Sequence, residues 1–182
     1  KKCNTIVIAT RHNTHAELII KALKAKKNVY VEKPLCLTYK ELDLINNAYT
    51  GDNLLMVGFN RRFSPLIQDV KNLIRKLPDE KSFIYTCNAG FIDSSHWTQD
   101  KKIGGGRLIG EACHFVDILR YLADSKIVKS NYIEAYDLKE CSDNFSIHLK
   151  FDNGSIGIIN YLSNGNKAYP KEKLEIFSGN AV

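Results

Sequence analysis

Residues 6–31 read IVIATRHNTHAELIIKALKAKKNVYV, in which a short apolar run, an amphipathic segment and a second apolar run follow one another. Ile6 to Ala9 has the length and composition of a buried strand. The THAE sequence at 14–17 matches a capping box, and apolar residues then recur at helical spacing until about Asn28. Asn28 to Val31 is predicted as the next strand. This order is typical of a parallel α/β unit.

The same pattern continues downstream. The TYKE sequence at 38–41 forms a second capping box and opens a helix that we expect to end at Gly51. Leu54 to Phe59 is predicted as a third strand. Strand, helix, strand, helix, strand is half of a doubly wound nucleotide-binding domain. We therefore assign residues 1–62 to part of a Rossmann-like domain with a parallel sheet.

The pattern changes after Phe63. Ser64 and Pro65 are suited to the N-cap and first position of an amphipathic helix that extends to Leu77. A strand, a polar glycine-rich loop and an apolar helix are expected next, followed by four strands, two of them joined by an Asn-Gly hairpin. Residues 63–182 are thus predicted to form an α+β domain with a mostly antiparallel open sheet. The expected ranges are 82–89, 93–106, 108–124, 132–138, 145–151, 156–162 and 173–177, with the hairpin at 152–155.

Composition excludes several classes of protein. The 182 residues are 44% hydrophobic and 25% charged, as in ordinary globular proteins, and no apolar run approaches the ~20 residues that span a bilayer. The first residues lack the features of a secretory signal. The formal charge of +6 lies in dispersed lysine doublets, so no nucleic-acid partner is expected. Single cysteines at 3, 36, 87, 113 and 141 indicate reduced thiols in a cytoplasmic protein, with no disulfide framework and no metal site.

Polar residues follow each predicted parallel strand, at the edge where open α/β sheets bind ligands. Thr10, Asn13 and His15 follow the first strand, where they could bind a cofactor or cap a helix. Lys33 follows the second strand and could donate to a ribose or substrate hydroxyl, or remain a solvated lysine. Arg61 follows the third strand, where a hydroxylated or anionic ligand and a domain-interface salt bridge are both possible partners.

A second group of candidates lies on the predicted helix 108–124 and in the loop before it. Gly110, His114 and Asp117 share one helical stripe. His114 could be a core histidine, or an active-site residue approached over Gly110 with its imidazole oriented by Asp117. Trp97 could line a sugar site or anchor the loop. The glycines at 104–110 match neither a dinucleotide fingerprint nor a P-loop.

Four motifs in order resemble the Gfo/Idh/MocA family of nicotinamide-dependent sugar and polyol oxidoreductases. They are IVIATRHNTH at 6–15, VYVEKPL at 29–35, GFNRRFSP at 58–65 and GGGRLIGEACHFVD at 104–117. The resemblance covers almost the whole chain. It implies a Rossmann domain followed by an α/β domain whose open sheet carries the substrate site and often mediates homo-oligomerisation.

The resemblance also implies roles for individual residues. The cofactor would be NAD or NADP, which the motifs do not distinguish, and the substrate a sugar, polyol or sugar nucleotide. Lys33 and His114 would be catalytic and handle the hydroxyl proton during hydride transfer. The residues implied in dinucleotide binding are Thr10, Asn13, His15, Glu32, Lys33 and Pro34, and those implied in substrate binding are Arg61, Trp97, Glu111 and Asp117.

The chain departs from the family pattern in two ways. Many members carry an aspartate four residues before the histidine, and here that position is Gly110. The glycine-rich first turn and the acidic residue for the adenine ribose would precede residue 1, and the last strands of the sheet would follow Val182. We therefore expect the chain to be a fragment that binds dinucleotide weakly or not at all and is inactive alone. The alternatives are a non-catalytic cofactor- or sugar-sensing protein, or an enzyme that uses bound NAD transiently in glycoside cleavage or epimerisation.

Overall fold

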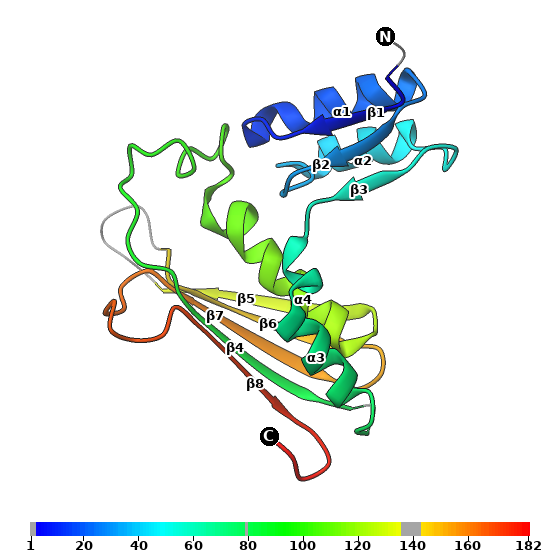
Figure 1. Ribbon diagram of the computed structural model, residues 1–182. Coiled ribbons are helices and arrows are strands. Elements are labelled where there is room, and N and C mark those ends of the chain that lie inside the picture. The colour runs from blue at the N-terminus through cyan, green and yellow to red at the C-terminus, as the bar shows by residue number, and fades with distance from the viewer. Residues whose placement is uncertain (1–2, 79, 136–142) are drawn as a thin grey trace. The chain divides into compact units, whose positions relative to one another are not determined.

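The structure is a computed structural model that describes residues 3–78, 80–135 and 143–182 (Figure 1). Its contacts divide the chain into two compact units. The first contains the residues up to Phe59 together with 94–113, and the second contains 60–93 together with 114–182. The predicted domain boundary at residue 62 lies close to the first of these divisions. The segment 94–113 groups with the first unit although it follows part of the second in sequence.

The first unit is a three-stranded parallel sheet with two helices, as the sequence predicts. Strands β1 (Thr5–Ile8), β2 (Asn28–Val31) and β3 (Leu55–Val57) pair in the order β1-β2-β3. Helices α1 (His15–Lys24) and α2 (Tyr39–Ala48) connect them. The core is made of fully buried aliphatic side chains from all of these layers, among them Ile8, Ile19, Val29, Val31 and Ile45. Burial of these side chains stabilises the unit and fixes the strand ends where the polar candidates lie.

Of the two predicted capping boxes in this unit, one is confirmed and one is wrong. The Thr38 hydroxyl accepts from the Glu41 backbone N–H, and the Glu41 carboxylate accepts from the Thr38 N–H. Thr14 makes no such cap, because the chain already turns in a 3₁₀ helix (His12–Thr14) and Thr14 has helical dihedral angles. An N-cap needs an extended backbone to aim its side chain at the first turn.

The second unit is built on a five-stranded mixed sheet with the order β5-β6-β7-β4-β8. Antiparallel pairing joins β5 to β6, β6 to β7 and β4 to β8, whereas β4 and β7 are parallel. The Asn-Gly hairpin between β6 and β7 is confirmed, with Gly154 at a φ of +87°. The strands are β4 (Ser82–Asn88), β5 (Ile127–Glu134), β6 (Phe145–Phe151), β7 (Ile156–Leu162) and β8 (Glu172–Phe177).

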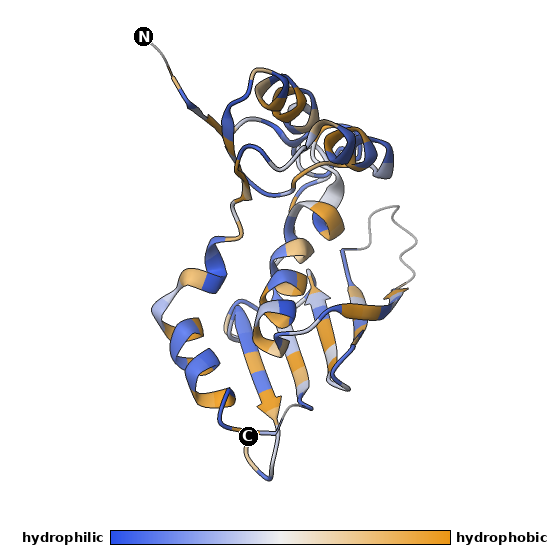
Figure 2. Ribbon diagram, turned by 90° about the vertical axis from the view of Figure 1, so that its right-hand side faces the viewer, coloured by the Kyte–Doolittle hydropathy of each residue, from blue (hydrophilic) through white to orange (hydrophobic). Residues whose placement is uncertain are grey.

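Two helices belong to this unit, α3 (Pro65–Ile74) and α4 (Cys113–Ala123), and α4 packs on one face of the sheet. Phe115 of α4 lies with its ring centroid 4.8 Å from that of Tyr85, and Leu119 lies over Gly157. Residues along β4, β6 and β7 alternate between buried and more accessible. Figure 2, coloured by hydropathy, shows hydrophobic and hydrophilic residues mixed along the strands of this sheet. The buried set faces α4 and forms the core of the unit.

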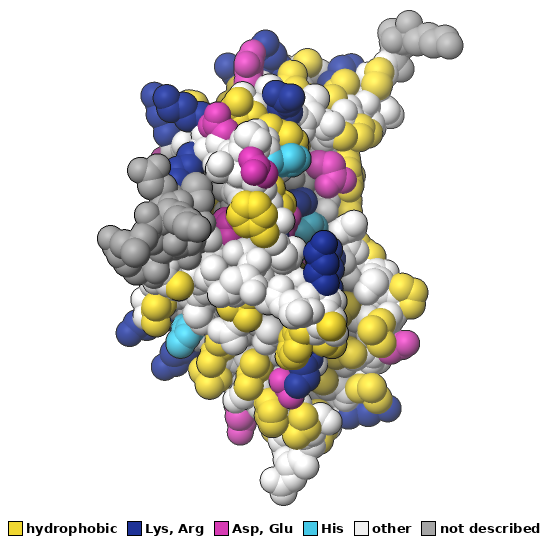
Figure 3. All heavy atoms as spheres, turned by 90° about the vertical axis from the view of Figure 1, so that its left-hand side faces the viewer, with side chains coloured by type: hydrophobic (Ala, Val, Ile, Leu, Met, Phe, Trp, Pro, Cys, Tyr) yellow, Lys and Arg dark blue, Asp and Glu magenta, His cyan; other side chains and the backbone are white. Residues whose placement is uncertain are grey.

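The opposite face of the sheet has an apolar centre without a helix of the described chain upon it. Ile84 and Ile158 are register partners on this face, and Ile156 and Phe177 are 48% and 39% exposed. Elsewhere charge is mixed: basic and acidic side chains are interspersed on the face that Figure 3 draws. No described helix is long and apolar enough to cross a membrane.

Strand β5 and the predicted helix 108–124 are two of the elements whose bounds differ from the predicted ones. Strand β5 begins at Ile127, before the predicted 132–138, of which 136–138 lie outside the described residues. It is accessible along its length, so it lacks the alternation by which a strand is recognised. The predicted helix 108–124 begins instead with a π-helical turn (Leu108–Ala112) that continues into α4. Such single turns are often found at functional sites.

Candidate functional site

The carboxyl end of β1 presents polar side chains to solvent. Thr10 and Asn13 are both exposed. The Thr10 hydroxyl lies 2.6 Å from that of Thr14, and Thr14 in turn donates to the Arg11 carbonyl. Of the two roles left open for these residues, helix capping does not apply at Thr14, and Thr10 and Asn13 are accessible to a ligand.

His15 is completely buried and connects two strand ends. Its Nδ1 lies 2.8 Å from the Pro34 carbonyl oxygen and its Nε2 lies 3.1 Å from the Thr10 carbonyl oxygen. Pro34 is buried as well, after a cis peptide bond from Lys33. Both ring nitrogens therefore face backbone, and what His15 visibly does is hold the loops after β1 and β2 together.

The acidic and basic residues that follow β2 are half-buried. Glu32 accepts from the Tyr30 hydroxyl at 3.1 Å. The Lys33 ammonium donates to the carbonyl oxygen of Gly110 at 2.8 Å. Gly110 lies in the π-helical turn that leads into α4, so the predicted catalytic lysine is tied to the segment that precedes the predicted catalytic histidine in sequence.

The segment 94–113 is held to the loop after β1 by two adjacent hydrogen bonds. The Asn13 backbone N–H donates to the Ile103 carbonyl at 3.1 Å, and His12 Nδ1 lies 2.8 Å from the Gly104 carbonyl oxygen. The Trp97 ring packs edge-on against His12 at 4.9 Å between centroids. His12 was not among the candidates predicted from the sequence, since its partner is 92 residues away.

Gly110 occupies a position with little room for a side chain. A Cβ there would lie 3.3 Å from the Gly104 carbonyl oxygen and 3.4 Å from Cε1 of His12. These distances are tighter than ordinary carbon contacts. The residue in the place of the family's aspartate is thus a glycine whose side-chain space is taken by His12 and by the glycine loop.

Electrostatics favour a neutral His12. Burial lowers the pKa of His12, the hydrogen bond to Gly104 opposes this, and the charges of His15 and Lys33 lower the pKa further. Because the carbonyl of Gly104 can only accept, Nδ1 carries the proton. Nε2 then keeps its lone pair in the neutral ring.

His114 and Asp117 lie on α4, and each is 8% exposed. The two oxygens of the Asp117 carboxylate accept from Nε and Nη2 of Arg62. The Arg62 guanidinium also lies over the Tyr121 ring, 5.3 Å from its centroid. Asp117 is thus bound to Arg62, and the expectation that it orients the His114 imidazole stays a prediction.

Arg61 takes part in a second charged cluster. Its Nη1 donates to Glu172 of β8, which also accepts from the Tyr85 hydroxyl at 2.6 Å. Its guanidinium lies 4.9 Å from the centre of the Phe115 ring. Although burial tends to raise the pKa of Glu172, the bonds from Arg61 and Tyr85 lower it below its ordinary value. Burial and the nearby carboxylate raise the pKa of Tyr85, which stays protonated.

The remaining candidates lie in the segment 94–113. Glu111 pairs with Arg107 one helical turn earlier, at 3.3 Å, and its side chain is 41% exposed. Trp97 packs against His12, and Arg11 lies 5.8 Å from its ring centre. These contacts fit the anchoring role considered for Trp97, and its role in lining a sugar site stays a prediction.

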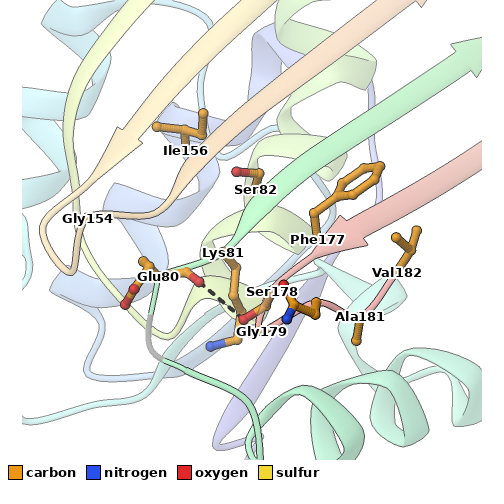
Figure 4. Close-up of a pocket in the computed structure, with 11 residues that line it drawn as sticks. Glu80, Lys81, Ser82, Gly154, Ile156, Phe177, Ser178, Gly179, Ala181 and Val182 are labelled. Carbon is orange, nitrogen blue, oxygen red and sulfur yellow. Dashed lines mark hydrogen bonds between the residues drawn. The ribbon is translucent and has the colours of Figure 1, made fainter.

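Two further observations concern metal binding and a pocket. No group of three or more metal-binding side chains occurs among the residues that the structure describes. A pocket of about 590 Å³ lies at another edge of the second unit, between Lys81, Ile156, Phe177 and the last residues (Figure 4). The Ser178 hydroxyl donates to the Glu80 carbonyl there at 3.2 Å. None of the predicted site residues lines this pocket.

Comparison with known families gives two matches that together cover most of the chain. Residues 1–59 match the model of an oxidoreductase family with an NAD-binding Rossmann fold. Residues 82–180 match the model of the GFO/IDH/MocA C-terminal domain. The first match contains the candidates that follow β1 and β2, and the second contains His114 and Asp117.

Similar proteins include several dehydrogenases. Myo-inositol 2-dehydrogenase of Thermotoga maritima is 27% identical over 96% of this chain and 54% of its own length. The scyllo-inositol 2-dehydrogenase (NAD(+)) of Bacillus subtilis is 30% identical over 85% of this chain and 47% of its own. The structure of a levoglucosan dehydrogenase in complex with NADH matches 96% of this chain and 52% of its own, at 26% identity and a TM-score of 0.82. The chain spans about half the length of these relatives.

Proposed function

Because the chain belongs to the GFO/IDH/MocA family of oxidoreductases, we propose that the protein containing it is an NAD(P)-dependent dehydrogenase of sugars, polyols or sugar nucleotides. The observation that carries the proposal is the Lys33 ammonium held by the Gly110 carbonyl at the carboxyl edge of a parallel sheet. This is the edge at which such sheets bind their ligands. The relatives named as inositol and levoglucosan dehydrogenases support the substrate class.

The residues at this edge have the chemistry that a dinucleotide requires. Hydroxyl and amide groups at Thr10 and Asn13 are exposed, and a carboxylate and an ammonium at Glu32 and Lys33 are half-buried. These groups would hydrogen-bond the hydroxyls of a ribose. A bound nicotinamide would supply or accept the hydride. Pro34 and His15 are buried and would act by fixing the loops that carry these groups.

Lys33 and His114 are the groups proposed to handle the hydroxyl proton. An ammonium has three N–H donors, and Gly110 accepts from one, so Lys33 can also donate to a substrate hydroxyl. His114 would take the proton of that hydroxyl in oxidation and return it in reduction. Arg61, Trp97, Glu111 and Asp117 are proposed as substrate-side residues, Arg61 together with its partner Glu172.

The open face of the five-stranded sheet is proposed as a homo-oligomer interface. Ile84, Ile156, Ile158 and Phe177 lie on it, opposite the face that α4 covers. Apolar area of this kind is commonly covered by a second subunit. We place the protein in the cytoplasm on the strength of its scattered cysteines, of which Cys3, Cys36, Cys87 and Cys113 form no disulfide.

The test uses the full-length protein with His114→Asn and Lys33→Met variants. Turnover of inositols, other polyols and sugars is followed with NAD and with NADP, and NADH affinity is titrated separately. The proposal predicts that both variants lose at least about a hundredfold in kcat. His114→Asn should keep NADH affinity within about threefold of the wild type.

The sensing alternative makes a different prediction. It is favoured by Gly110, which stands in the place of the family's aspartate. A wild-type protein that binds NADH tightly and yet oxidises none of these substrates would replace the dehydrogenase proposal with the sensor. Bound NAD that is regenerated in each cycle, without net release of NADH, would indicate glycoside cleavage or epimerisation.

A further inference from the structure

We infer that His12 is a positioning residue: through Nδ1–H it fixes the Gly104 carbonyl, and with it the turn whose Gly110 carbonyl holds the Lys33 ammonium. The inference deepens the proposed function and, in its kinetic part, rests on it. The contacts that carry it all lie within the first unit.

The first step is the attachment of the segment. Residues 12 and 13 on one side bond to 104 and 103 on the other, at 2.8 and 3.1 Å. The backbone N–H groups of Gly104 and Gly105 both donate to the Asp100 carbonyl, which lies within the same segment. Gly105 and Gly106 have positive φ angles of 80° and 72°, which glycine adopts without strain. A turn of this kind depends on external bonds for its position.

The second step is packing around the imidazole. Trp97 lies edge-on against one side of the His12 ring, and the ring of His15 lies at 5.7 Å between centroids. Cε1 of His12 approaches the place of a Cβ on Gly110 to 3.4 Å. The imidazole thus bonds to Gly104 at one end of the glycine segment and fills the side-chain space of Gly110 at the other.

The third step connects His12 to Lys33. The carbonyl of Gly110 accepts from Lys33, and the His12 ring occupies the space where a side chain of residue 110 would lie. A shift of the turn would move the carbonyl that orients the ammonium. Misplacement of a reacting group by about 1 Å can cost about a hundredfold in rate. His12 would therefore act on the rate without touching substrate.

Because only one ring nitrogen of His12 carries a proton, two amide substitutions can separate the roles of Nδ1 and Nε2. The Nδ1 proton bonds to Gly104, whereas Nε2 keeps a lone pair. Asparagine places an N–H donor near the position of Nδ1, and glutamine places its amide near the position of Nε2. His12→Asn should therefore preserve the function that we assign, and His12→Gln should not.

The experiment compares His12→Ala, His12→Asn and His12→Gln in the full-length protein. His96→Asn is the matched control, because His96 bonds to Thr98 within its own loop. We expect His12→Ala and His12→Gln to lower kcat about tenfold with little change in NADH affinity. His12→Asn should stay within about threefold of the wild type, and the control should equal it.

A second readout needs no turnover. Lys101 and Lys102 are exposed, so trypsin cuts the segment when it detaches. Cleavage there should be about five- to tenfold faster in His12→Ala and His12→Gln than in the wild type or His12→Asn, as expected for loss of one hydrogen bond. Nitrogen-15 NMR of the wild type should show the proton of His12 on Nδ1.

Defined results would overturn the inference. Rescue by glutamine but not by asparagine would mean that His12 acts through Nε2 on a ligand. Equal cleavage in all variants would mean that the segment does not depend on His12. If the wild type oxidises no substrate, the proposed function fails, whereas the cleavage and NMR results still decide the role of His12.

Discussion

Asp117 shows how a single carboxylate can join two elements of the fold. Its side chain is 7% exposed and accepts two bonds from Arg62, whose side chain is 28% exposed. The pair joins α4 to the residues just before α3. Removing one partner leaves a largely buried charge without its counterion.

We predict that Asp117→Asn lowers the free energy of unfolding by about 2 kcal/mol, less than for a fully buried pair because Arg62 is partly hydrated. Urea unfolding of the variant and the wild type measures this difference in the free energy of unfolding. Glu17→Gln is the control, since the Glu17–Lys21 pair is exposed and should give no measurable change. Equal stability of Asp117→Asn and the wild type would show that the pair is not a stabilising contact.

Glu172 leads to a prediction about how the stability of the fold depends on pH. Its pKa in the folded protein is below the ordinary value of 4.5, so its ionisation stabilises the fold above that pH. This stability is lost as the pH falls through the lowered folded-state pKa. Glu172→Gln should therefore reduce the loss of stability between pH 5 and pH 3, measured by denaturant unfolding at each pH. If the stability of Glu172→Gln depends on pH as that of the wild type does, Glu172 does not cause the loss of stability at low pH.

Some residue-scale features could be predicted from the sequence and others could not. Lys33 and His114 could be proposed from the sequence because they stand in local motifs, Lys33 after a predicted strand and His114 on a predicted helix. His12 and the carbonyl of Gly110 were missed because their bonds join residues 92 and 77 positions apart. A local pattern carries no information about such pairs, and a backbone carbonyl carries no residue signature at all.

At the scale of elements, the two threonines of the predicted capping boxes make a matched experiment. Thr38 caps α2 with both bonds of the box, whereas Thr14 follows a 3₁₀ turn and makes no cap bond. We predict that Thr38→Ala costs about 1 kcal/mol of stability. Thr14→Ala should cost less, because only its bonds to Arg11 and Thr10 are lost. Thermal unfolding of both variants tests the order, and a reversed order would contradict it.

The elements that could be predicted are those with strong local patterns. Residues 28–31, 145–151 and 156–162 were predicted with the bounds that the structure gives. Strand β5 was misplaced because it is accessible along its length. The π-helical turn could not be predicted, since no local pattern separates it from an α-helix; its Gly110 carbonyl accepts from Lys33, 77 positions earlier.

At the scale of the whole molecule, the return of residues 94–113 to the first unit was beyond sequence patterns. The predicted boundary at 62 lies near the division at Phe59, but contiguous domains were assumed. The polar, glycine-rich character of this segment predicted a loop correctly. Which unit would hold it depended on His12 and Asn13, whose loop precedes the segment by some eighty residues in sequence.

The open sheet face supplies a prediction about assembly. Ile158→Lys would place a charge at the centre of that face, beside Ile84. We expect the wild-type full-length protein to sediment as an oligomer and the variant to dissociate, because burying an unpaired ammonium is costly. Asn47→Lys, at an exposed position on α2 of the first unit, controls for the added charge. A monomeric wild type would contradict the proposed interface.

The most direct test of the central claim is a substrate screen of the full-length protein, wild type and His114→Asn, monitored by the absorbance of reduced nicotinamide. Inositols, other polyols, sugars and sugar nucleotides are each supplied with NAD and with NADP. We predict that the wild type reduces the cofactor with at least one of these substrates. The His114→Asn variant should bind NADH and reduce none. A folded wild type that binds NADH and stays inactive throughout, or a His114→Asn variant as active as the wild type, would contradict the account.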